Sequence, residues 1–103
     1  MAVTAIVVTA ATASPSYADD ASDAAVLAIS RKHCIMCHAA NPSHESFQAA
    51  PKNIILETIA DLRKHAVTIY AQTVQTRAMP LGNQSDMADD ERVMLGRWLK
   101  EQR

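Results

Sequence analysis

Two cysteines and a histidine lie within the five residues from Cys34 to His38, and this spacing constrains the fold more than any other feature of the chain. On a helical turn, positions i, i+3 and i+4 share a face, so both thiols and the imidazole can point at one object. Cys-x-x-Cys-His is the attachment pattern of c-type haem. The pattern therefore predicts one covalent haem c, bound through Cys34 and Cys37, with its iron held by His38.

Two other uses of a Cys-x-x-Cys pair suit this chain less well. A structural zinc ion normally takes four Cys or His ligands, and the sequence has no second cysteine pair. A thioredoxin-type disulfide belongs beside a βαβ pattern, for which the sequence gives no sign. A long-range disulfide framework is excluded because the only two cysteines are three residues apart.

The rest of the sequence predicts a single all-α domain over residues 19–103. A length of 103 residues allows one domain. Strict alternation of apolar and polar residues is not sustained anywhere, and there are only two glycines, so strands are not expected. A domain this small buries only roughly 60% of its unfolded surface. We therefore expect about four short helices that wrap around the haem and gain stability from it.

Local signals mark where these helices begin and end. Ser22 or Asp23 can cap a first helix that runs into the cysteine motif. Prolines and small polar residues predict an irregular loop over 39–53. Two helices with a bend near His65 follow, Pro80 ends the second of them, and a last helix packs across the first. The expected apolar faces are Ala25, Val26 and Ile29; Leu56, Ile59, Leu62 and Ala66; Val67, Tyr70 and Val74; and Leu95, Trp98 and Leu99.

The second axial ligand of the iron decides the chemistry, because a closed iron passes electrons whereas an open one binds or activates small molecules. The candidates are Met79, Met87, Met94, His44 and His65. Met79 is the predicted ligand: it lies 41 residues beyond His38, enough chain to pass around the porphyrin, and Pro80 stiffens the backbone beside it. Met87 is the runner-up ligand, with packing as its expected use, and Met94 is expected to fill the core.

The remaining histidines are not predicted to bind the iron. His33 is expected at the surface or in a hydrogen bond to the haem periphery. His44 is expected to be a solvated loop residue that can contact a propionate, and His65 is expected in solvent near a helix end.

Residues 1–18 predict an export signal. They form an apolar, small-residue run, and Ser16 and Ala18 occupy the positions that favour cleavage after Ala18. Because no Lys or Arg precedes the run, the stub of a membrane segment from a longer parent chain is the alternative. We expect a periplasmic domain without stable membrane insertion of its own, associated with a membrane only through a partner or a missing parent domain. A formal charge of −1 gives no reason to expect a nucleic-acid partner.

Several motifs together carry a family resemblance. With Cys-x-x-Cys-His near its start, Ala-Met-Pro after two helices and a Trp-bearing last helix, the chain resembles the class I cytochrome c family. It also resembles, over about Ser30 to Leu99, the C-terminal cytochrome c domain of bacterial membrane-bound urate oxidases. The stretches that carry this second resemblance are His33 to His38, Ala50 to Lys52, Ala78 to Asn83, Glu91 to Arg92 and Leu95 to Trp98. The resemblance implies a haem domain between an oxidase module and the respiratory chain, although the membrane part that would oxidise urate is missing.

The sequence thus predicts a monomeric one-electron carrier rather than an enzyme. Electrons are expected to pass through the exposed haem edge to and from redox protein partners, the donor being a dehydrogenase or oxidase module. The alternative is a haem enzyme or gas sensor with an open sixth coordination site, in which Met79 only packs.

Overall fold

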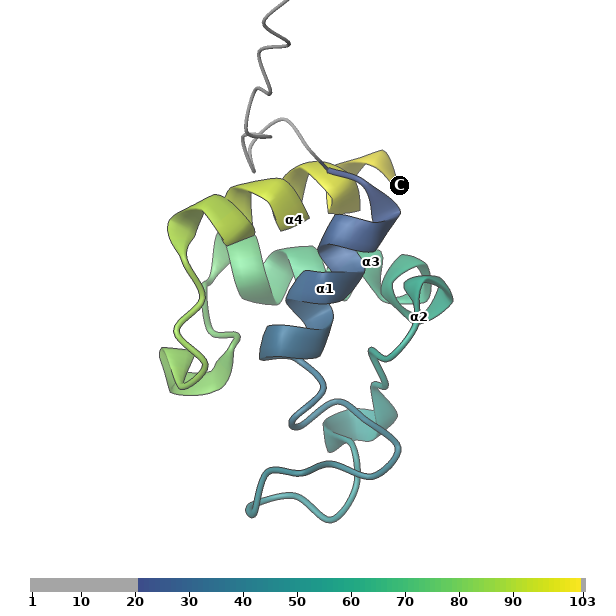
Figure 1. Ribbon diagram of the computed structural model, residues 1–103, viewed down its shortest axis with the longest axis vertical. Coiled ribbons are helices and arrows are strands. Elements are labelled where there is room, and N and C mark those ends of the chain that lie inside the picture. The colour runs from purple at the N-terminus through teal and green to yellow at the C-terminus, as the bar shows by residue number, and fades with distance from the viewer. Residues whose placement is uncertain (1–20, 103) are drawn as a thin grey trace, which may run out of the picture.

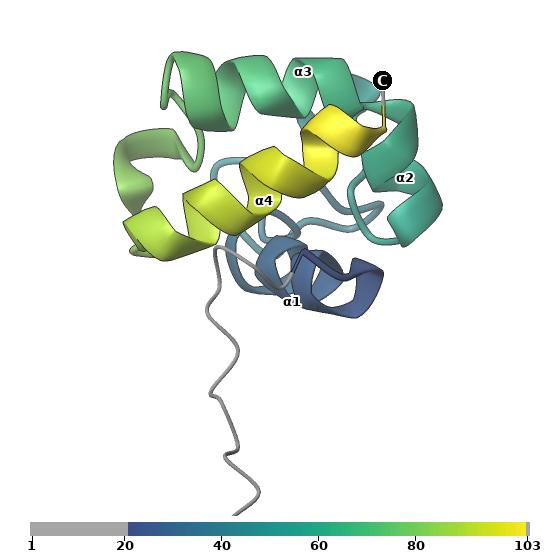
Figure 2. The same cartoon turned by 90° about the horizontal axis from the view of Figure 1, so that it is seen from above.

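The structure, a computed structural model, describes residues 21–102, which are helical and contain no strand. Its elements in chain order are α1 (Asp23–His33), the 3-10 turn η1 (Pro51–Asn53), α2 (Ile59–Lys64), α3 (Ala66–Tyr70), the π-helical segment η2 (Ala71–Gln75), the 3-10 turn η3 (Leu81–Asn83) and α4 (Asp89–Glu101). α4 contacts both α1 and α3, and the long loop after α1 extends away from these helices (Figures 1 and 2). The expected all-α architecture is confirmed for this part of the chain.

The structure tests only part of the prediction that the chain is exported. The predicted signal, residues 1–18, lies outside the described residues. Within 21–102, no helix has the length and hydropathy needed to cross a bilayer.

α1 begins where the sequence predicts. The Ser22 hydroxyl accepts a hydrogen bond from the Ala25 N–H at 3.2 Å, which satisfies one of the free donors of the first turn. Basic residues in the last turn complement the helix dipole. Val26 and Ile29 are buried, as expected for the inner face of this helix.

The bend between α2 and α3 is confirmed at His65, which lies between the two helices. The apolar face predicted after the bend is wrong in part, because Val67 is 62% exposed. The buried line instead runs through Leu62, Ala66, Ile69 and Thr73. This line keeps steps of three and four residues, so the bend does not rotate the inner face onto a new set of positions.

The core forms where α4 lies against α1 and the α2–α3 segment. Its buried members are Val26, Ile29, Leu56, Leu62, Ala66, Ile69, Met87, Met94, Leu95, Trp98 and Leu99. The Trp98 Nε1–H donates to Asp23 Oδ1 at 2.8 Å, which fixes α4 to the start of α1. Gly96 lets η2 approach closely, since a Cβ there would lie 3.1 Å from Val74 Cγ2. The predicted packing of the last helix across the first is therefore confirmed.

Candidate haem site

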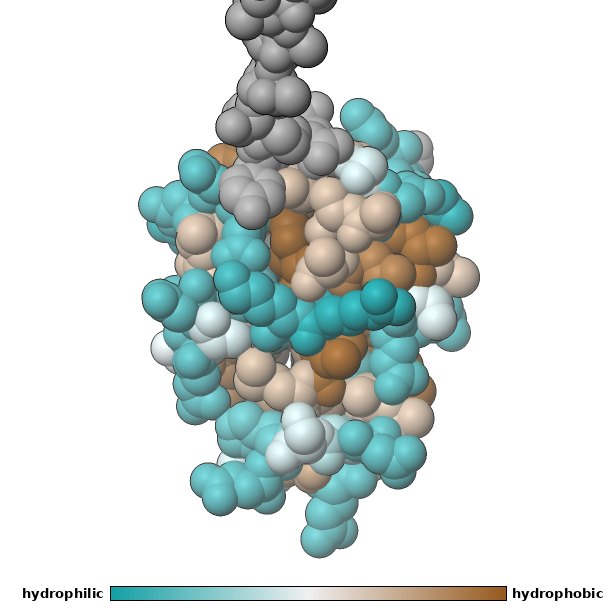
Figure 3. Space-filling model, in the orientation of Figure 1, coloured by the Kyte–Doolittle hydropathy of each residue, from teal (hydrophilic) through white to brown (hydrophobic). Residues whose placement is uncertain are grey.

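A cavity lies among the turn after α1, the 44–56 segment, the α3–η2 segment and the loop after η2. Its volume of about 240 Å³ exceeds that of an engineered cavity of about 150 Å³ that binds benzene. Apolar side chains line much of it, among them Phe47, Ile54, Leu56, Ile69 and Leu81. In the view of Figure 3, apolar side chains gather over the helices in the upper part of the molecule. The loops in the lower part are mainly hydrophilic.

All four residues predicted to hold the cofactor line this one cavity: Cys34, Cys37, His38 and Met79. The first three lie on one turn, because the N–H groups of Cys37 and His38 donate to the Cys34 carbonyl at 3.2 Å and 2.8 Å. Met79 comes from a separate loop, after η2. The fold therefore brings together residues that the sequence separates by 41 positions.

Backbone contacts determine how His38 is held. Its Nδ1–H donates to the Ile54 carbonyl at 2.9 Å, and its own carbonyl accepts from the Leu56 N–H at 2.8 Å. The Ser30 hydroxyl in turn donates to the Leu56 carbonyl at 2.7 Å. Because Nδ1 carries the proton, Nε2 is the ring nitrogen with a lone pair for a metal.

Both cysteines are half-buried, and burial raises the pKa of each thiol. Burial raises the pKa of Cys34 to about 11, with a smaller raising effect from Cys37, and a hydrogen bond with Ser30 only partly offsets both. Burial also raises the pKa of Cys37. Redox-active cysteines have lowered pKa values instead. Residues 21–102 also contain no cluster of three or more His, Cys, Asp or Glu side chains arranged to hold a metal ion.

These features fit a haem c. Two thiols on one turn match the attachment of one porphyrin edge. An imidazole oriented through its Nδ1–H and a thioether from another loop are a known axial pair of c-type cytochromes. The apolar lining suits a flat aromatic macrocycle.

The Met79 backbone is fixed from two sides. Its N–H donates to the Gln72 carbonyl at 2.9 Å, and its carbonyl accepts from Arg92 Nη1 at 2.8 Å. The other methionine candidates lie elsewhere: Met87 and Met94 are buried in the core and do not line the cavity. The packing roles predicted for these two methionines are confirmed.

One prediction about the histidines, the surface position of His33, needs correction. His33 is not at the surface but only 3% exposed, with Nδ1 2.7 Å from Ser85 Oγ and Nε2 2.8 Å from Glu91 Oε2. His44 lines the cavity and donates from Nε2 to Gln84 Oε1 at 2.9 Å. His65 is half-buried and lies outside the cavity lining. The surface prediction for His33 is wrong because polar partners on distant segments satisfy its ring.

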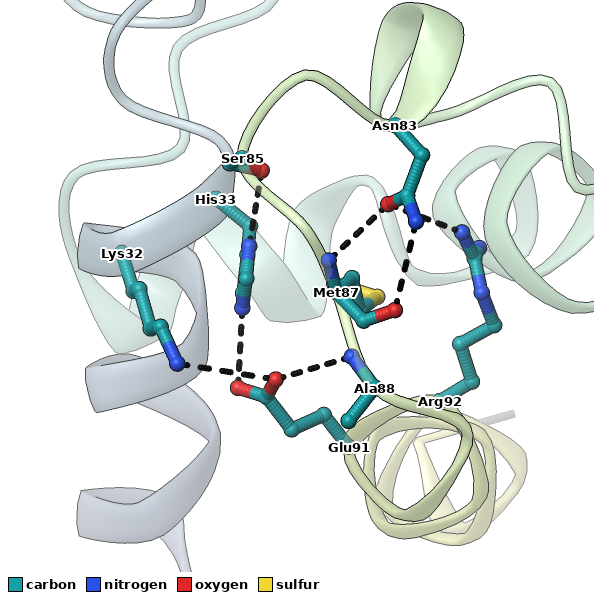
Figure 4. Close-up of polar contacts among 8 residues, drawn as sticks. All are labelled: Lys32, His33, Asn83, Ser85, Met87, Ala88, Glu91 and Arg92. Carbon is teal, nitrogen blue, oxygen red and sulfur yellow. Dashed lines mark hydrogen bonds and ion pairs between the residues drawn. The ribbon is translucent and has the colours of Figure 1, made fainter.

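Glu91 joins the start of α4 to the end of α1 (Figure 4). Its carboxylate accepts from the Ala88 N–H at 3.0 Å, contacts His33, and lies 3.7 Å from Lys32 Nζ. Burial acts to raise the pKa of Glu91, but the Ala88 hydrogen bond and the contacts with His33 and Lys32 outweigh it. The net result is a pKa below the usual value of a glutamate.

Three contributors to this site are absent from the predictions made on the sequence. The Ile54 and Leu56 backbone groups hold His38, and Arg92 holds Met79. A sequence does not indicate which backbone carbonyls will accept hydrogen bonds from a site. An arginine inside an otherwise apolar helical face, in contrast, could have indicated that Arg92 has a buried partner. Comparison of the chain with family models, curated proteins and solved structures finds no match.

Proposed function

We propose that this chain is a single-haem c-type cytochrome of the class I kind, which carries one electron at a time and is not itself an enzyme. The observation that carries the proposal is the convergence of the Cys34–His38 turn and Met79 on one largely apolar cavity. Neither a zinc site nor a dithiol redox site would require a thioether in the same cavity as the cysteine turn.

Each residue of the turn has a distinct task in this proposal. Cys34 and Cys37 would hold the haem, each thiol adding its sulfur to one carbon and its proton to the other carbon of a porphyrin vinyl group. His38 and Met79 would hold the iron. When bound, the haem supplies reversible one-electron exchange between its ferrous and ferric states.

The protein around the proposed haem would determine its reduction potential. The Nδ1–H bond to the Ile54 carbonyl keeps the His38 ring in one orientation and increases its basicity. A neutral thioether and an apolar lining favour the ferrous state and raise the reduction potential. An iron held by both His38 and Met79 would have no open position for a substrate, which is the basis for proposing a carrier.

The proposed partners and location rest on the sequence alone. We propose brief contacts with redox proteins at the haem edge, small enough to separate after each transfer. The resemblance to urate oxidase cytochrome domains favours an oxidase module as donor and the respiratory chain as acceptor, with the domain acting as a monomer in the periplasm.

The test is to express the full chain with the haem-attachment machinery and replace Met79 with Ala. The wild-type protein should gain the mass of one haem, show the weak long-wavelength absorption band of Met-ligated ferric haem, and not bind carbon monoxide readily when ferrous. The Met79→Ala variant should lose the band and bind carbon monoxide.

Met87→Leu is the matched control, because Met87 is buried outside the cavity. It should keep the band. A wild-type protein that lacks the band and binds carbon monoxide would favour an open-site haem enzyme or sensor. A chain with the mass of the bare polypeptide that unfolds cooperatively would refute haem binding altogether.

A further inference from the structure

Arg92 lies beside the segment that carries Met79 and is 8% exposed. Its Nη1 donates to the Met79 carbonyl and to the Thr73 carbonyl, both at 2.8 Å. We propose that Arg92 is a positioning residue that holds the Met79 loop in the geometry needed for axial ligation. This inference rests on the proposed function, since it assigns the role relative to Met79 as a ligand.

The partners of Arg92 show that its charge is used to hold backbone. None of the ion pairs among residues 21–102 includes Arg92, whose hydrogen bonds go to two carbonyl oxygens and one amide oxygen. A buried cation needs such acceptors, because losing them leaves a charge without solvation. Movement of the loop away from Arg92 would therefore cost free energy, because the guanidinium would lose these acceptors.

The two carbonyls that share Nη1 come from different segments. Thr73 belongs to η2, whereas Met79 lies in the loop that follows. A single guanidinium nitrogen thus ties the loop to the end of the preceding helix, and α4 carries the guanidinium. Because the accepted carbonyl is that of Met79 itself, the bond acts on the proposed ligand directly.

Asn83 extends this contact along the loop (Figure 4). Its Oδ1 accepts from the Met87 N–H at 2.9 Å and from Arg92 Nη2 at 3.5 Å. Its own N–H donates to the Pro80 carbonyl at 2.8 Å. Hydrogen bonds therefore link residues within the loop 79–87, and Arg92 anchors this loop to α4.

A nearby ion pair provides the contrast. Arg77 Nη2 lies 2.6 Å from Asp89 Oδ1 and also links the loop region to α4, but the side chains are 57% and 85% exposed. Exposed pairs of this kind contribute little. Arg77 is thus a matched control for the loss of an arginine near the same loop.

The test measures how easily added imidazole displaces Met79 from ferric haem in the full-length holoprotein. The apparent affinity for imidazole rises with the fraction of molecules whose loop is detached. Loss of a charge-assisted hydrogen bond in Arg92→Met should lower the half-saturating imidazole concentration roughly ten- to a hundredfold. Arg92→Lys, which keeps one charged donor, should show a smaller decrease and carries the test if Arg92→Met does not fold.

Two controls separate positioning from general destabilisation. Arg77→Met should leave the imidazole titration unchanged. Leu95→Ala, a core variant of α4, should lower the unfolding midpoint in urea with little effect on imidazole binding at low urea. Unchanged imidazole binding in Arg92→Met and Arg92→Lys, or an equal change in Leu95→Ala, would overturn the inference. A wild-type protein without haem or without Met ligation would instead overturn the proposed function.

Discussion

Replacing Glu91 with Gln should destabilise the folded protein at neutral pH by about 1.5–3 kcal/mol. Glu91 uses both oxygens as acceptors, one toward the Ala88 N–H and one toward His33 Nε2 at 2.8 Å. Glutamine is neutral and has a single acceptor oxygen, so the two charge-assisted hydrogen bonds of the carboxylate are lost or replaced by weaker neutral ones. A hydrogen bond to a charged group contributes about 1.5–3 kcal/mol, and the exposed Lys32 adds less than about 1 kcal/mol.

The pH dependence of this loss follows from the pKa of Glu91. Burial acts to raise that pKa, but the Ala88 hydrogen bond and the contacts with His33 and Lys32 bring it below the usual value of 4.5. A carboxylate with a lowered folded-state pKa stabilises the protein above the usual value, and that stability is lost as pH falls through the folded-state pKa. The difference between wild type and Glu91→Gln should therefore be constant above about pH 5 and shrink below the usual value of 4.5.

The assay is urea unfolding of the full chain, followed by circular dichroism, at pH 7 and at successively lower pH. In a separate thermal melt at pH 7, the expected loss corresponds to a fall in Tm of roughly 4–8 °C per kcal/mol for a domain of this size. Glu101→Gln at the exposed end of α4 is the control for the same chemical change and should have little effect. A Glu91→Gln variant that is as stable as wild type, or equally destabilised at pH 7 and pH 3, would refute the charge-based reasoning.

Two further predictions concern α1 and the thiols. Ser30→Ala should cost about 1–3 kcal/mol in urea unfolding, because the buried Leu56 carbonyl loses its 2.7 Å donor; a change below about 0.5 kcal/mol would contradict this. The second prediction concerns protein made without haem attachment, in which burial raises the pKa of Cys34 to about 11. At pH 8 iodoacetamide should alkylate Cys34 more slowly than Cys37, and the Cys34 rate should increase as the pH rises. Equal rates for the two cysteines, measured by peptide mass mapping, would contradict this prediction.

The fold was predictable where local chemistry determines it. Ser22 and the apolar spacing of Val26 and Ile29 suffice to place α1, and Trp98 marks the inner face of α4. The error at Val67 arose from resetting the helical phase at the bend, although the buried positions continue through it unchanged. Hydropathy alone does not distinguish these two phases, because both contain apolar residues at helical spacing.

The candidate site was predictable only for the residues that carry its chemistry. Cys34 to His38 form a local motif, and Met79 stands out by its distance and by Pro80. The burial of His33 was missed because its partner Glu91 is 58 residues away. Long-range polar pairs of this kind depend on tertiary packing, which the order of residues does not show directly.

The first turns of α4 connect both sides of the cavity through two adjacent residues. Successive helix positions lie about 100° apart, so neighbouring side chains can serve different segments. Glu91 reaches the end of α1, directly before the cysteine turn, whereas Arg92 reaches the Met79 carbonyl. Both contacts therefore come from one helix, which Trp98 and the core fix against α1. In the proposed cytochrome, the direct contact from Arg92 positions Met79, and general packing of α4 contributes stability.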